Sequence, residues 1–433
     1  MIIAAGASAS DPHPTKSPLS TSLKVGLFLA IREIRRGNIW ATLLIIAVMV
    51  LTFLNLIVVS GVLIGLIQAS VDANRVRYTG DILISAFKDE SYIQHSTDIE
   101  QTLDSMPEVQ VISPRYTEDG QVEANYKESR KPSQLANTAG GLITGIDPLS
   151  ESQVTGLGSK LVEGSYLAPD DYDMILIGAN LLTKYTPIES PGLTTLRNVQ
   201  AGSKVRLTVN GVQREVTIKG VLKTKVGEID QRIFMPEKQF RQLIGRTDLN
   251  VGEIAVKLKD PSYAQEVVDS LDAQGFGQYA AIQTWQDAQP KFLQDIKATF
   301  AILANMISSI GLVVAAITIF IVIFVNAITR RRSIGILKGI GISATAIEFS
   351  YVLQALFYAV VGMAIGSLFV FGFLKPYIDL HPINFPFSDG ILVADLSGTL
   401  IRVGILMVAT IIAGFIPARI VVNQNTLDAI LGR

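Results

Sequence analysis

The chain has 433 residues, of which 49% are hydrophobic and only 17% are charged, whereas about 25% of the residues in an average soluble protein are charged. This shortfall argues against a purely soluble protein. The 37 Lys and Arg residues nearly balance the 38 Asp and Glu residues, so the chain lacks the positive field that would attract nucleic acid. It contains no cysteine, which excludes disulfides, thiol nucleophiles and Cys-based metal sites.

The N-terminal part of the chain predicts a tail followed by an amphipathic helix. Residues 1–22 are rich in Ser, Pro and Ala. We expect a disordered cytoplasmic tail there and no signal peptide, because a basic region ahead of an apolar core is missing. Residues 23–38 have the spacing of an amphipathic helix that lies in the membrane interface. Its apolar face consists of Leu23, Leu27, Ile31 and Ile34. Three arginines elsewhere on the helix predict an interfacial anchor: Arg32, Arg35 and Arg36.

Four apolar segments predict four transmembrane helices, because a helix needs about 20 mostly apolar residues to cross a bilayer. They comprise residues 39–68, 298–329, 346–374 and 396–418. The charge-free part of the fourth segment is short, but the arginines at its two ends, Arg402 and Arg419, can extend their side chains towards water. The first two helices are longer than a bilayer requires, so the excess either projects as a stalk or is taken up by tilt.

The distribution of Lys and Arg predicts the orientation, since short cytoplasmic segments are enriched in these residues. They collect before the first helix, in residues 330–345 and after the fourth helix. We therefore predict a multi-pass protein of the cell (inner) membrane with both termini in the cytoplasm, the C-terminal tail being residues 419–433. Residues 375–395 are then an external loop, and residues 69–297 form an extracytoplasmic domain.

The two ends of this inserted domain have matching patterns. Residues 81–115 and 252–290 each contain strand, helix and strand signals in that order. This pattern predicts a membrane-proximal α/β lobe that is assembled from both ends of the insertion. Residues 116–251 are richer in strand and turn signals and predict a β-rich distal lobe.

The clearest element of the distal lobe is a hairpin that turns at Asn210-Gly211, a pair suited to a two-residue type I′ turn. We expect surface loops at residues 136–141 and 186–192. The predicted fold class is an α-helical membrane protein with four transmembrane helices and a large α+β extracytoplasmic domain between helices one and two.

Residues 330–345, between helices two and three, have the strongest functional pattern. Three consecutive arginines complement the dipole of the preceding helix and can anchor it at anionic headgroups. The residues after them predict a short amphipathic element with an exposed apolar set, which consists of Ile334, Leu337 and Ile340. Such an element can dock into a groove on another protein. The alternative is a simple interfacial loop.

This segment, from Arg331 to Gly341, resembles the cytoplasmic coupling segment of the FtsX/MacB/lipoprotein-releasing (LolC/LolE-like) permease family of ABC transporters. In that family an Ile-Gly pair and a later Gly follow the second helix. Residues 30–38 and 414–419 are similar to the family's lead-in to helix one and to its end of helix four. At residues 425–427 the chain lacks a Pro that the family often has, which leaves the subfamily open.

The resemblance implies the membrane subunit of a transporter that couples ATP hydrolysis by a separate subunit to motion of the extracytoplasmic domain. No Walker A pattern occurs in the chain, so ATP and Mg²⁺ would be used by that partner, with no cofactor bound here and no catalysis by this chain. The residues expected to couple to the ATPase are Arg331, Ile334, Gly335, Leu337, Lys338 and Gly341. The implied partners are an ABC ATP-binding subunit, a second permease of the same or a related kind, membrane lipid, and a periplasmic adaptor or a cell-wall hydrolase.

Three functions stay open at this point. The favoured one is export or extraction of a hydrophobic, lipoprotein or peptide-like cargo. An FtsX-like relay of ATPase motion to an external cell-wall hydrolase is the first alternative, and a membrane-anchored binding or sensor module without an ATPase is the second. The inserted domain is large for a simple relay, which favours transport.

Small residues within the spans predict close helix packing. They follow small-xxx-small spacing, which lets helix backbones approach each other, and include Gly61, Gly65, Gly311, Gly362 and Gly366. Packing within one chain and packing between two chains explain them equally well. No metal site is expected, because the three histidines are scattered, and the His-Glu-x-x-His pattern of metalloproteases is absent.

Overall fold

The computed structural model describes residues 19–37, 39–126, 136–186, 194–384, 389–390, 392–394 and 396–423. The chain forms two compact units, a helical unit (Met1–Gly65, Thr299–Pro382 and Ile391–Arg433) and an inserted unit (Leu66–Ala298 and Ile383–Gly390). Residues 1–18 of the predicted N-terminal tail, most of the predicted loop at 186–192 and most of the predicted C-terminal tail lie outside the described residues. Residues 19–22, predicted to belong to the tail, are instead the first residues of helix α1 (Leu19–Arg36), so the amphipathic helix begins earlier than predicted.

Four helices among the described residues are long and apolar enough to cross a membrane, which confirms the predicted class of fold. The first comprises α2 (Ile39–Leu54), α3 (Ser60–Asn74) and two π-helical turns, η1 (Asn55–Val59) and η2 (Arg75–Thr79). The second is α9 (Lys291–Thr329). The third comprises α11 (Ala344–Phe369), η8 (Val370–Leu374) and α12 (Lys375–Leu380), and the fourth is α13 (Leu396–Val422).

These helices extend beyond the predicted spans. The first continues to Thr79 instead of ending at residue 68, and α9 begins at Lys291 instead of residue 298. The added turns carry charged residues such as Arg75 and Asp295. Charge ends the part of a helix that can sit in hydrocarbon, but it does not end the helix, and charge-free runs therefore underestimate helix length.

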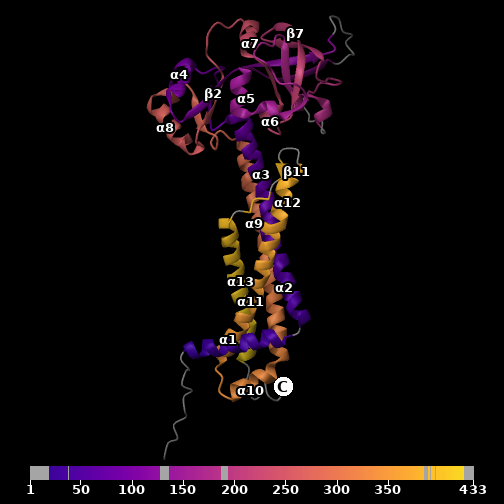
Figure 1. The fold of residues 1–433 in the computed structure, drawn as a ribbon, viewed down its shortest axis with the longest axis vertical. Coiled ribbons are helices and arrows are strands. Elements are labelled where there is room, and N and C mark those ends of the chain that lie inside the picture. Colours follow the sequence, from indigo (N-terminus) through magenta and orange to yellow (C-terminus); the bar gives the residue numbers. More distant parts are fainter. Residues whose placement is uncertain are drawn as a thin grey trace, which may run out of the picture. The chain divides into compact units, whose positions relative to one another are not determined.

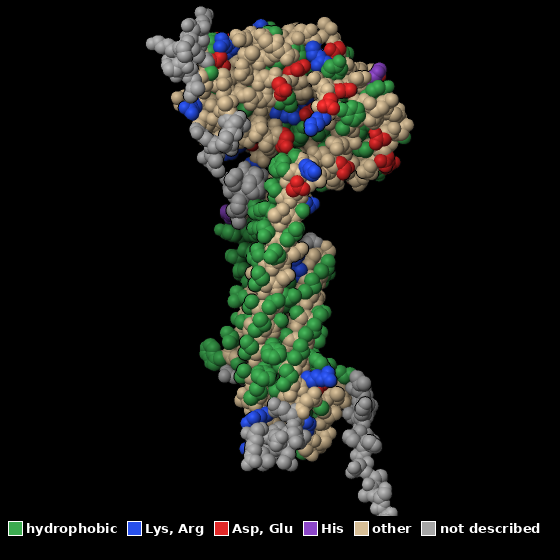
Figure 2. Space-filling view, turned by 180° about the vertical axis from the view of Figure 1, so that it is seen from behind, with side chains coloured by type: hydrophobic (Ala, Val, Ile, Leu, Met, Phe, Trp, Pro, Cys, Tyr) green, Lys and Arg blue, Asp and Glu red, His purple; other side chains and the backbone are tan. Residues whose placement is uncertain are grey.

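The helical unit packs around α11, which contacts α2, α13 and the N-terminal helix α1 (Leu19–Arg36) (Figure 1). Its core includes Met49 and Phe53 of α2 and Tyr351 of α11. Figure 2 shows hydrophobic side chains over the outward surface of this unit, as expected for a surface in contact with lipid. A short helix, α10 (Arg331–Gly339), connects α9 to α11.

The inserted unit contains one ten-stranded sheet among its described residues, in the order β10-β1-β9-β2-β3-β8-β5-β7-β4, with β6 pairing to β2 and β7. Most neighbours are antiparallel, whereas the pairs β3/β8 and β5/β7 are parallel. The strands are β1 (Ile82–Ser85), β2 (Val109–Ala124), β3 (Asn137–Ile146), β4 (Leu161–Gly164), β5 (Met174–Gly178), β6 (Lys204–Val209), β7 (Val212–Leu222), β8 (Arg232–Pro236), β9 (Glu253–Leu258) and β10 (Ala281–Thr284). A separate pair joins β11 (Ile383–Asn384) to β12 (Asp389–Gly390).

Helices cover this sheet. The α-helices are α4 (Ser96–Ser105), α5 (Pro148–Thr155), α6 (Gly227–Asp230), α7 (Glu237–Ile244) and α8 (Ala264–Ala273). Short 3-10 turns are η3 (Leu157–Lys160), η4 (Ala179–Leu181), η5 (Thr183–Tyr185), η6 (Pro261–Tyr263) and η7 (Phe276–Gln278). Strands from both ends of the insertion alternate in the order β10-β1-β9-β2, and the long strand β2 continues from there into the middle part of the sheet. The two predicted lobes thus share one continuous sheet.

The hairpin prediction is confirmed, because β6 and β7 pair around Asn210 and Gly211, whose φ angles are 46° and 79°. The predicted loop at 136–141 is wrong, because most of it is the first half of β3. Gly141 lies opposite Gly120 of β2, and a Cβ on Gly141 would lie 2.4 Å from the carbonyl oxygen of Gln231. Glycine here permits a close approach of backbones in a strand, not a turn.

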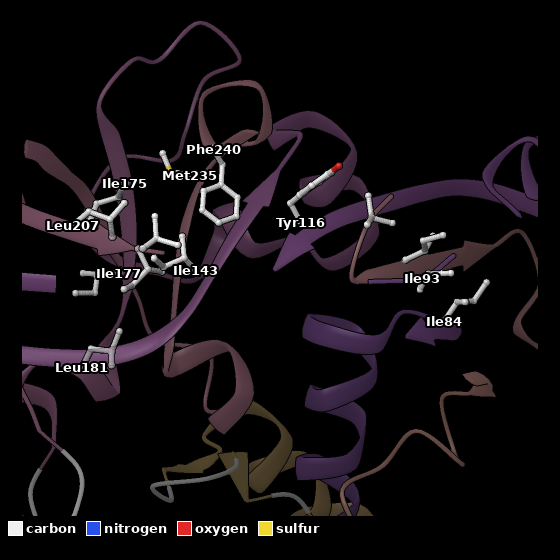
Figure 3. Close-up of a cluster of buried hydrophobic side chains, with 14 of the residues drawn as sticks. Ile84, Ile93, Tyr116, Ile143, Ile175, Ile177, Leu181, Leu207, Met235 and Phe240 are labelled. Carbon is white, nitrogen blue, oxygen red and sulfur yellow. The ribbon is translucent and has the colours of Figure 1, made fainter. Parts of the chain in front are cut away.

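A large hydrophobic core fixes the sheet of the inserted unit. Ile143 of β3, Ile177 of β5 and Phe240 of α7 are each fully buried in it (Figure 3). The same cluster extends to Ile84 of β1 and Ile93. The ends and the middle of the insertion therefore fold as one unit.

Candidate functional site

The segment between α9 and α11 forms a short helix because its local sequence starts and stops it. Arg330 occupies the N-cap position of α10, with non-helical backbone angles. After α10, Gly341 adopts a φ of 95°, a conformation that L side chains rarely adopt. The Ser343 hydroxyl then accepts a hydrogen bond from the amide of Ala346 at 3.3 Å and caps α11.

The exposed face of α10 differs from the predicted one. Ile334 is only 4% exposed and belongs to the core of the helical unit, and Leu337 packs against that core. The apolar side chains that reach the surface are Ile336, 50% exposed, and Ile340, 71% exposed. The prediction of an exposed Ile334 is therefore wrong. The amphipathic pattern is present, but its apolar residues lie on both faces of the helix, and one face packs against α13.

Of the other predicted coupling residues, two are held against the helical unit by burial or by a hydrogen bond. Gly335 is buried. Lys338 Nζ donates to the carbonyl oxygen of Val422 at 2.9 Å, which places a positive charge at the C-terminal end of α13, where a helix dipole favours it. Arg331 is half-buried, whereas Gly341 is exposed, and no described residue lies within 4 Å of a Cβ built on Gly341. The role of these residues in ATPase coupling stays a prediction.

Helix α1 places its three predicted anchor residues, Arg32, Arg35 and Arg36, on the surface. Several apolar side chains of the same helix are also exposed: Leu23, Leu27, Phe28 and Ile31. The predicted apolar face is thus mostly outward, apart from the half-buried Ile34. An outward apolar strip beside arginines is the arrangement expected for a helix in the lipid interface.

The predicted packing glycines meet residues of their own chain. A Cβ on Gly362 would lie 2.4 Å from Met49 Cβ, and one on Gly366 would lie 2.5 Å from Phe53 Cδ1. On Gly311 it would lie 2.6 Å from Asn55 Oδ1, and on Gly61 it would lie 2.7 Å from the carbonyl oxygen of Val393. Gly65 is buried. Packing within one chain is therefore sufficient to explain the four glycines with these contacts.

The inserted unit contains a buried ionic cluster that sequence reasoning missed, around Tyr78 in η2 at the end of the first long helix. Arg115 of β2 donates from Nε and Nη2 to the two carboxylate oxygens of Glu151, at 2.8 and 2.9 Å. Arg232 of β8 donates from Nη1 and Nη2 to Glu253 of β9, at 2.9 and 2.7 Å. The Tyr78 hydroxyl donates a hydrogen bond to Glu253 at 3.0 Å. The backbone carbonyl oxygen of Tyr78 accepts one from Arg115 Nη2 at 2.9 Å.

Both guanidinium groups of this cluster also lie against the Tyr78 ring, at 5.5 Å for Arg115 and 4.8 Å for Arg232. This distance is within the range of cation–π attraction. Arg115 and Glu151 are fully buried, so each charge depends on its partner for the interactions that water would otherwise supply. The cluster therefore holds the last turn of the first long helix within the inserted unit.

The charges of this cluster stabilise one another. Burial lowers the pKa of Arg115, but the charge of Glu151 and hydrogen bonds to it raise the pKa more, so the net shift is upward. Burial raises the pKa of Glu253, but Arg232 and then Arg115 lower it further, to about 2. Arg115 and Glu253 are consequently both charged at neutral pH.

A second set of contacts joins η2, and Asp81 just after it, to the segment that leads into α9. Arg75 Nη2 lies 2.6 Å from Asp81 Oδ1, and its guanidinium lies 4.9 Å from the centre of the Trp285 ring. The amide of Trp285 donates to the carbonyl oxygen of Asp81 at 3.0 Å. The end of the first long helix and the approach to the second are thus linked inside the inserted unit.

No catalytic arrangement emerges from these contacts. Within the residues that the structure describes, no group of three or more His, Cys, Asp or Glu side chains could hold a metal ion. Two features of the described residues stand out: a short helix with the exposed Ile336, followed directly by the exposed Ile340, and a buried ionic cluster at the end of a long helix.

The chain is a multi-pass membrane protein with a large domain between its first two spans, and comparison with known families identifies it further. Residues 42–274 match the family described as MacB-like periplasmic core domain, and residues 305–426 match the FtsX-like permease C-terminal family. The first match alone covers more than half of the chain. The protein therefore belongs to the MacB/FtsX/LolC-like family of ABC transporter permeases.

Relatives with assigned names agree with this family. The lipoprotein-releasing system transmembrane protein LolC of Neisseria meningitidis is 25% identical over 244 residues, which are 54% of this chain and 56% of LolC. The macrolide export ATP-binding/permease protein MacB of Burkholderia pseudomallei is 28% identical over 193 residues, 44% of this chain and 28% of MacB. The chain thus spans about half or less of the length of these relatives.

Two solved structures are similar to part of the chain. The periplasmic region of MacB from Actinobacillus actinomycetemcomitans is 17% identical with a TM-score of 0.34, and the match covers 49% of this chain and 92% of that one. The extracellular domain of the noncanonic ABC-type transporter YknZ from Gram-positive bacteria is 14% identical with a TM-score of 0.31, and the match covers 47% and 98%.

Proposed function

We propose that this chain is the permease subunit of an ABC transporter and that α10 docks onto a separate ATP-binding subunit. The observation that carries the proposal is the exposure of Ile336 on α10 and of Ile340, the residue directly after α10, while another face of this helix is packed against the bundle. Two adjacent apolar side chains on a supported helix suit a hydrophobic groove on a partner. In this arrangement the chain performs no catalysis itself, and the partner binds ATP and Mg²⁺.

In the proposed orientation, both termini and α10 lie in the cytoplasm and the inserted domain lies outside the cell (inner) membrane. Closure of the ATPase would move α10 and, through the long helices, the inserted domain. The ionic cluster around Tyr78 supports this route, because it holds the end of the first long helix by charged hydrogen bonds that involve three strands (β2, β8 and β9) and one helix (α5) of that domain. A second permease subunit, identical or related, completes the proposed assembly.

For the cargo, we propose a hydrophobic, lipoprotein or peptide-like molecule that is exported or extracted at the outer leaflet. The names of the relatives, which refer to lipoprotein release and macrolide export, support this class. An FtsX-like relay to an external hydrolase would use the same helices and the same α10, and differs only in what the inserted domain contacts.

The docking proposal is tested by co-purification of the ATPase from native membranes in mild detergent. Ile340→Asp and Ile336→Asp should abolish recovery of a Walker-type ATPase, because a charge in an apolar groove is not compensated. Leu380→Asp is the matched control, since Leu380 is also exposed, at 77%, but belongs to α12 at the far end of the third span. Equal recovery with Ile340→Asp, Leu380→Asp and the unaltered chain would refute docking through α10.

A further inference from the structure

Helix α1 contacts both ends of the segment that contains α10. Residue 330 begins that segment and residue 343 ends it. The hydroxyl oxygens of Ser22 and Ser343 are 3.2 Å apart, and Glu33 Oε1 lies 3.3 Å from Arg330 Nη1. Figure 1 shows α1 lying across the long helices at the end of the bundle that carries α10.

A stripe of small residues lets α1 approach α11 between these two contacts. A Cβ on Gly26 would lie 2.8 Å from the carbonyl oxygen of Ala346 and 3.0 Å from Phe349 Cδ1. Ala30, one turn further along, is 2% exposed. Ser22, Gly26 and Ala30 have the i, i+4, i+8 spacing of one helix face, so α1 has a fixed inner face distinct from its outward apolar strip.

Glu33 joins three helices at the end of this stripe. Besides Arg330, the N-cap residue of α10, its carboxylate accepts a hydrogen bond from Gln354 Nε2 of α11 at 2.5 Å. The side chain is 23% exposed, so water screens the pair only in part. Beside it is a cavity of about 40 Å³, which is lined by Tyr351, whose buried hydroxyl has no hydrogen-bond partner among the described residues. That volume and polarity suit an ordered water.

We propose that α1 braces α10 and that Glu33 is the positioning residue that fixes the start of α10 for docking. The proposal rests on the function proposed above. The exposed apolar side chains on the outward side of α1, Phe28 and Ile31, hold the brace in the lipid interface, and the inner side of α1 fixes both ends of the segment. Loss of Glu33 keeps the exposed Ile336 and Ile340 but no longer fixes the orientation of α10. Docking is then weaker although the docking residues are unchanged.

The variant that tests this is Glu33→Gln, which keeps the shape of the side chain and removes its charge. Arg32→Gln is the matched control, because it removes a charge from the adjacent, exposed position of the same helix. We expect Glu33→Gln to weaken ATPase binding about tenfold, the factor expected for a charge-assisted hydrogen bond of ordinary strength, and Arg32→Gln to leave it within about twofold. Arg330→Gln should reproduce Glu33→Gln if that variant fails to accumulate.

A disulfide provides the rescue. Since the chain has no native cysteine, Ser22→Cys with Ser343→Cys introduces the sole pair of thiols, at positions whose hydroxyl oxygens are 3.2 Å apart. Oxidation restores one end of the brace. The comparison is between two proteins that both carry the cysteine pair, one with Glu33 and one with Glu33→Gln. When both are oxidised, their affinities for the ATPase should agree within about twofold. When both are reduced, the Glu33→Gln protein should again bind roughly tenfold more weakly.

The outcomes separate the brace from the proposed function. Unchanged binding in Glu33→Gln, an equal loss in Arg32→Gln, or a loss that oxidation leaves in place would each overturn the brace. If the unaltered chain binds no ATPase, the docking proposal fails. The rate at which the pair introduced by Ser22→Cys and Ser343→Cys forms a disulfide then tests the brace independently of docking. A slower rate in Glu33→Gln than in Arg32→Gln supports the brace, whereas equal rates or no disulfide refute it.

Discussion

Replacement of Arg115 by Met should destabilise the inserted domain strongly. Met fills most of the same volume but removes the guanidinium that donates twice to Glu151. Glu151 is fully buried and, among the described residues, would retain as side-chain donors the hydroxyls of Ser113 and Thr155, at 2.7 and 3.0 Å. Two neutral donors do not compensate a buried carboxylate, whose desolvation costs several kcal/mol.

The expected cost is that of breaking a buried ion pair, about 3–5 kcal/mol. For a domain of about 230 residues, this range corresponds to a fall in the unfolding midpoint of roughly 6–20 °C. The double variant Arg115→Met with Glu151→Leu should recover much of the loss, since an apolar pair can replace a buried ion pair at little cost. The coupling between the two sites is therefore large and favourable.

The assay is thermal unfolding of the full chain in detergent at one scan rate, with the two single variants and the double variant compared in one cycle. Arg214→Gln is the control, because Arg214 pairs with Asp173 at the surface, with side-chain exposures of 41% and 33%. Its midpoint should not change. Two results would refute the reasoning. One is a fall of under about 2 °C for Arg115→Met, which is less than about 1 kcal/mol in a domain of this size. The other is a double variant whose loss of stability equals the sum of the losses of the two single variants.

Three further predictions concern pH and helix packing. The pKa of Glu253 is lowered from 4.5 to about 2. The stability that the charged Glu253 contributes is therefore complete above pH 4.5 and is lost towards pH 2. An unfolding midpoint that stays constant between about pH 5 and about pH 2.5 would contradict this. Burial and then the charge of Glu237 raise the pKa of Glu100 from 4.5 to about 7, so stability should decrease from pH 4.5 to 7, and Glu100→Gln should remove that decrease; an unchanged pH profile would exclude it. Gly362→Ala should lower the midpoint, because overpacking costs about 1–3 kcal/mol and its Cβ would lie 2.4 Å from Met49. Gly404→Ala, with no described residue within 4 Å of its Cβ, is the control, and equal midpoints would show that α2 and α11 do not pack closely.

The sequence was sufficient to predict the class of fold because the bilayer imposes a length on every apolar helix. The helix ends could not be predicted from the sequence, because the charges near Arg75 end the apolar run but not the hydrogen-bonded helix. The β3 strand was misread because its glycines serve a close backbone approach at Gln231, a contact between segments far apart in the sequence.

The candidate site was predictable in place but not in detail. Residues 330–345 contain the short helix, yet the choice between Ile334 and Ile336 as the outward residue depends on how α10 packs against the bundle. For α1, the small residues Ser22 and Gly26 have readable helical spacing, but the apolar strip is the stronger signal and predicts only that the helix lies in the membrane interface. The ionic cluster offered no signal, because Arg115 and its partner Glu151 are ordinary charged residues until the fold buries them.

Whether α10 contacts an ATPase is decided by site-specific cross-linking in native membranes. A single Ile340→Cys in this cysteine-free chain would carry a short thiol-reactive photo-cross-linker, with Leu380→Cys, also strongly exposed, as the matched position. The docking proposal predicts an adduct of Ile340→Cys with a Walker-type nucleotide-binding protein and none from Leu380→Cys. Adducts with lipid alone from both positions would contradict it and favour a membrane-anchored binding or sensor module.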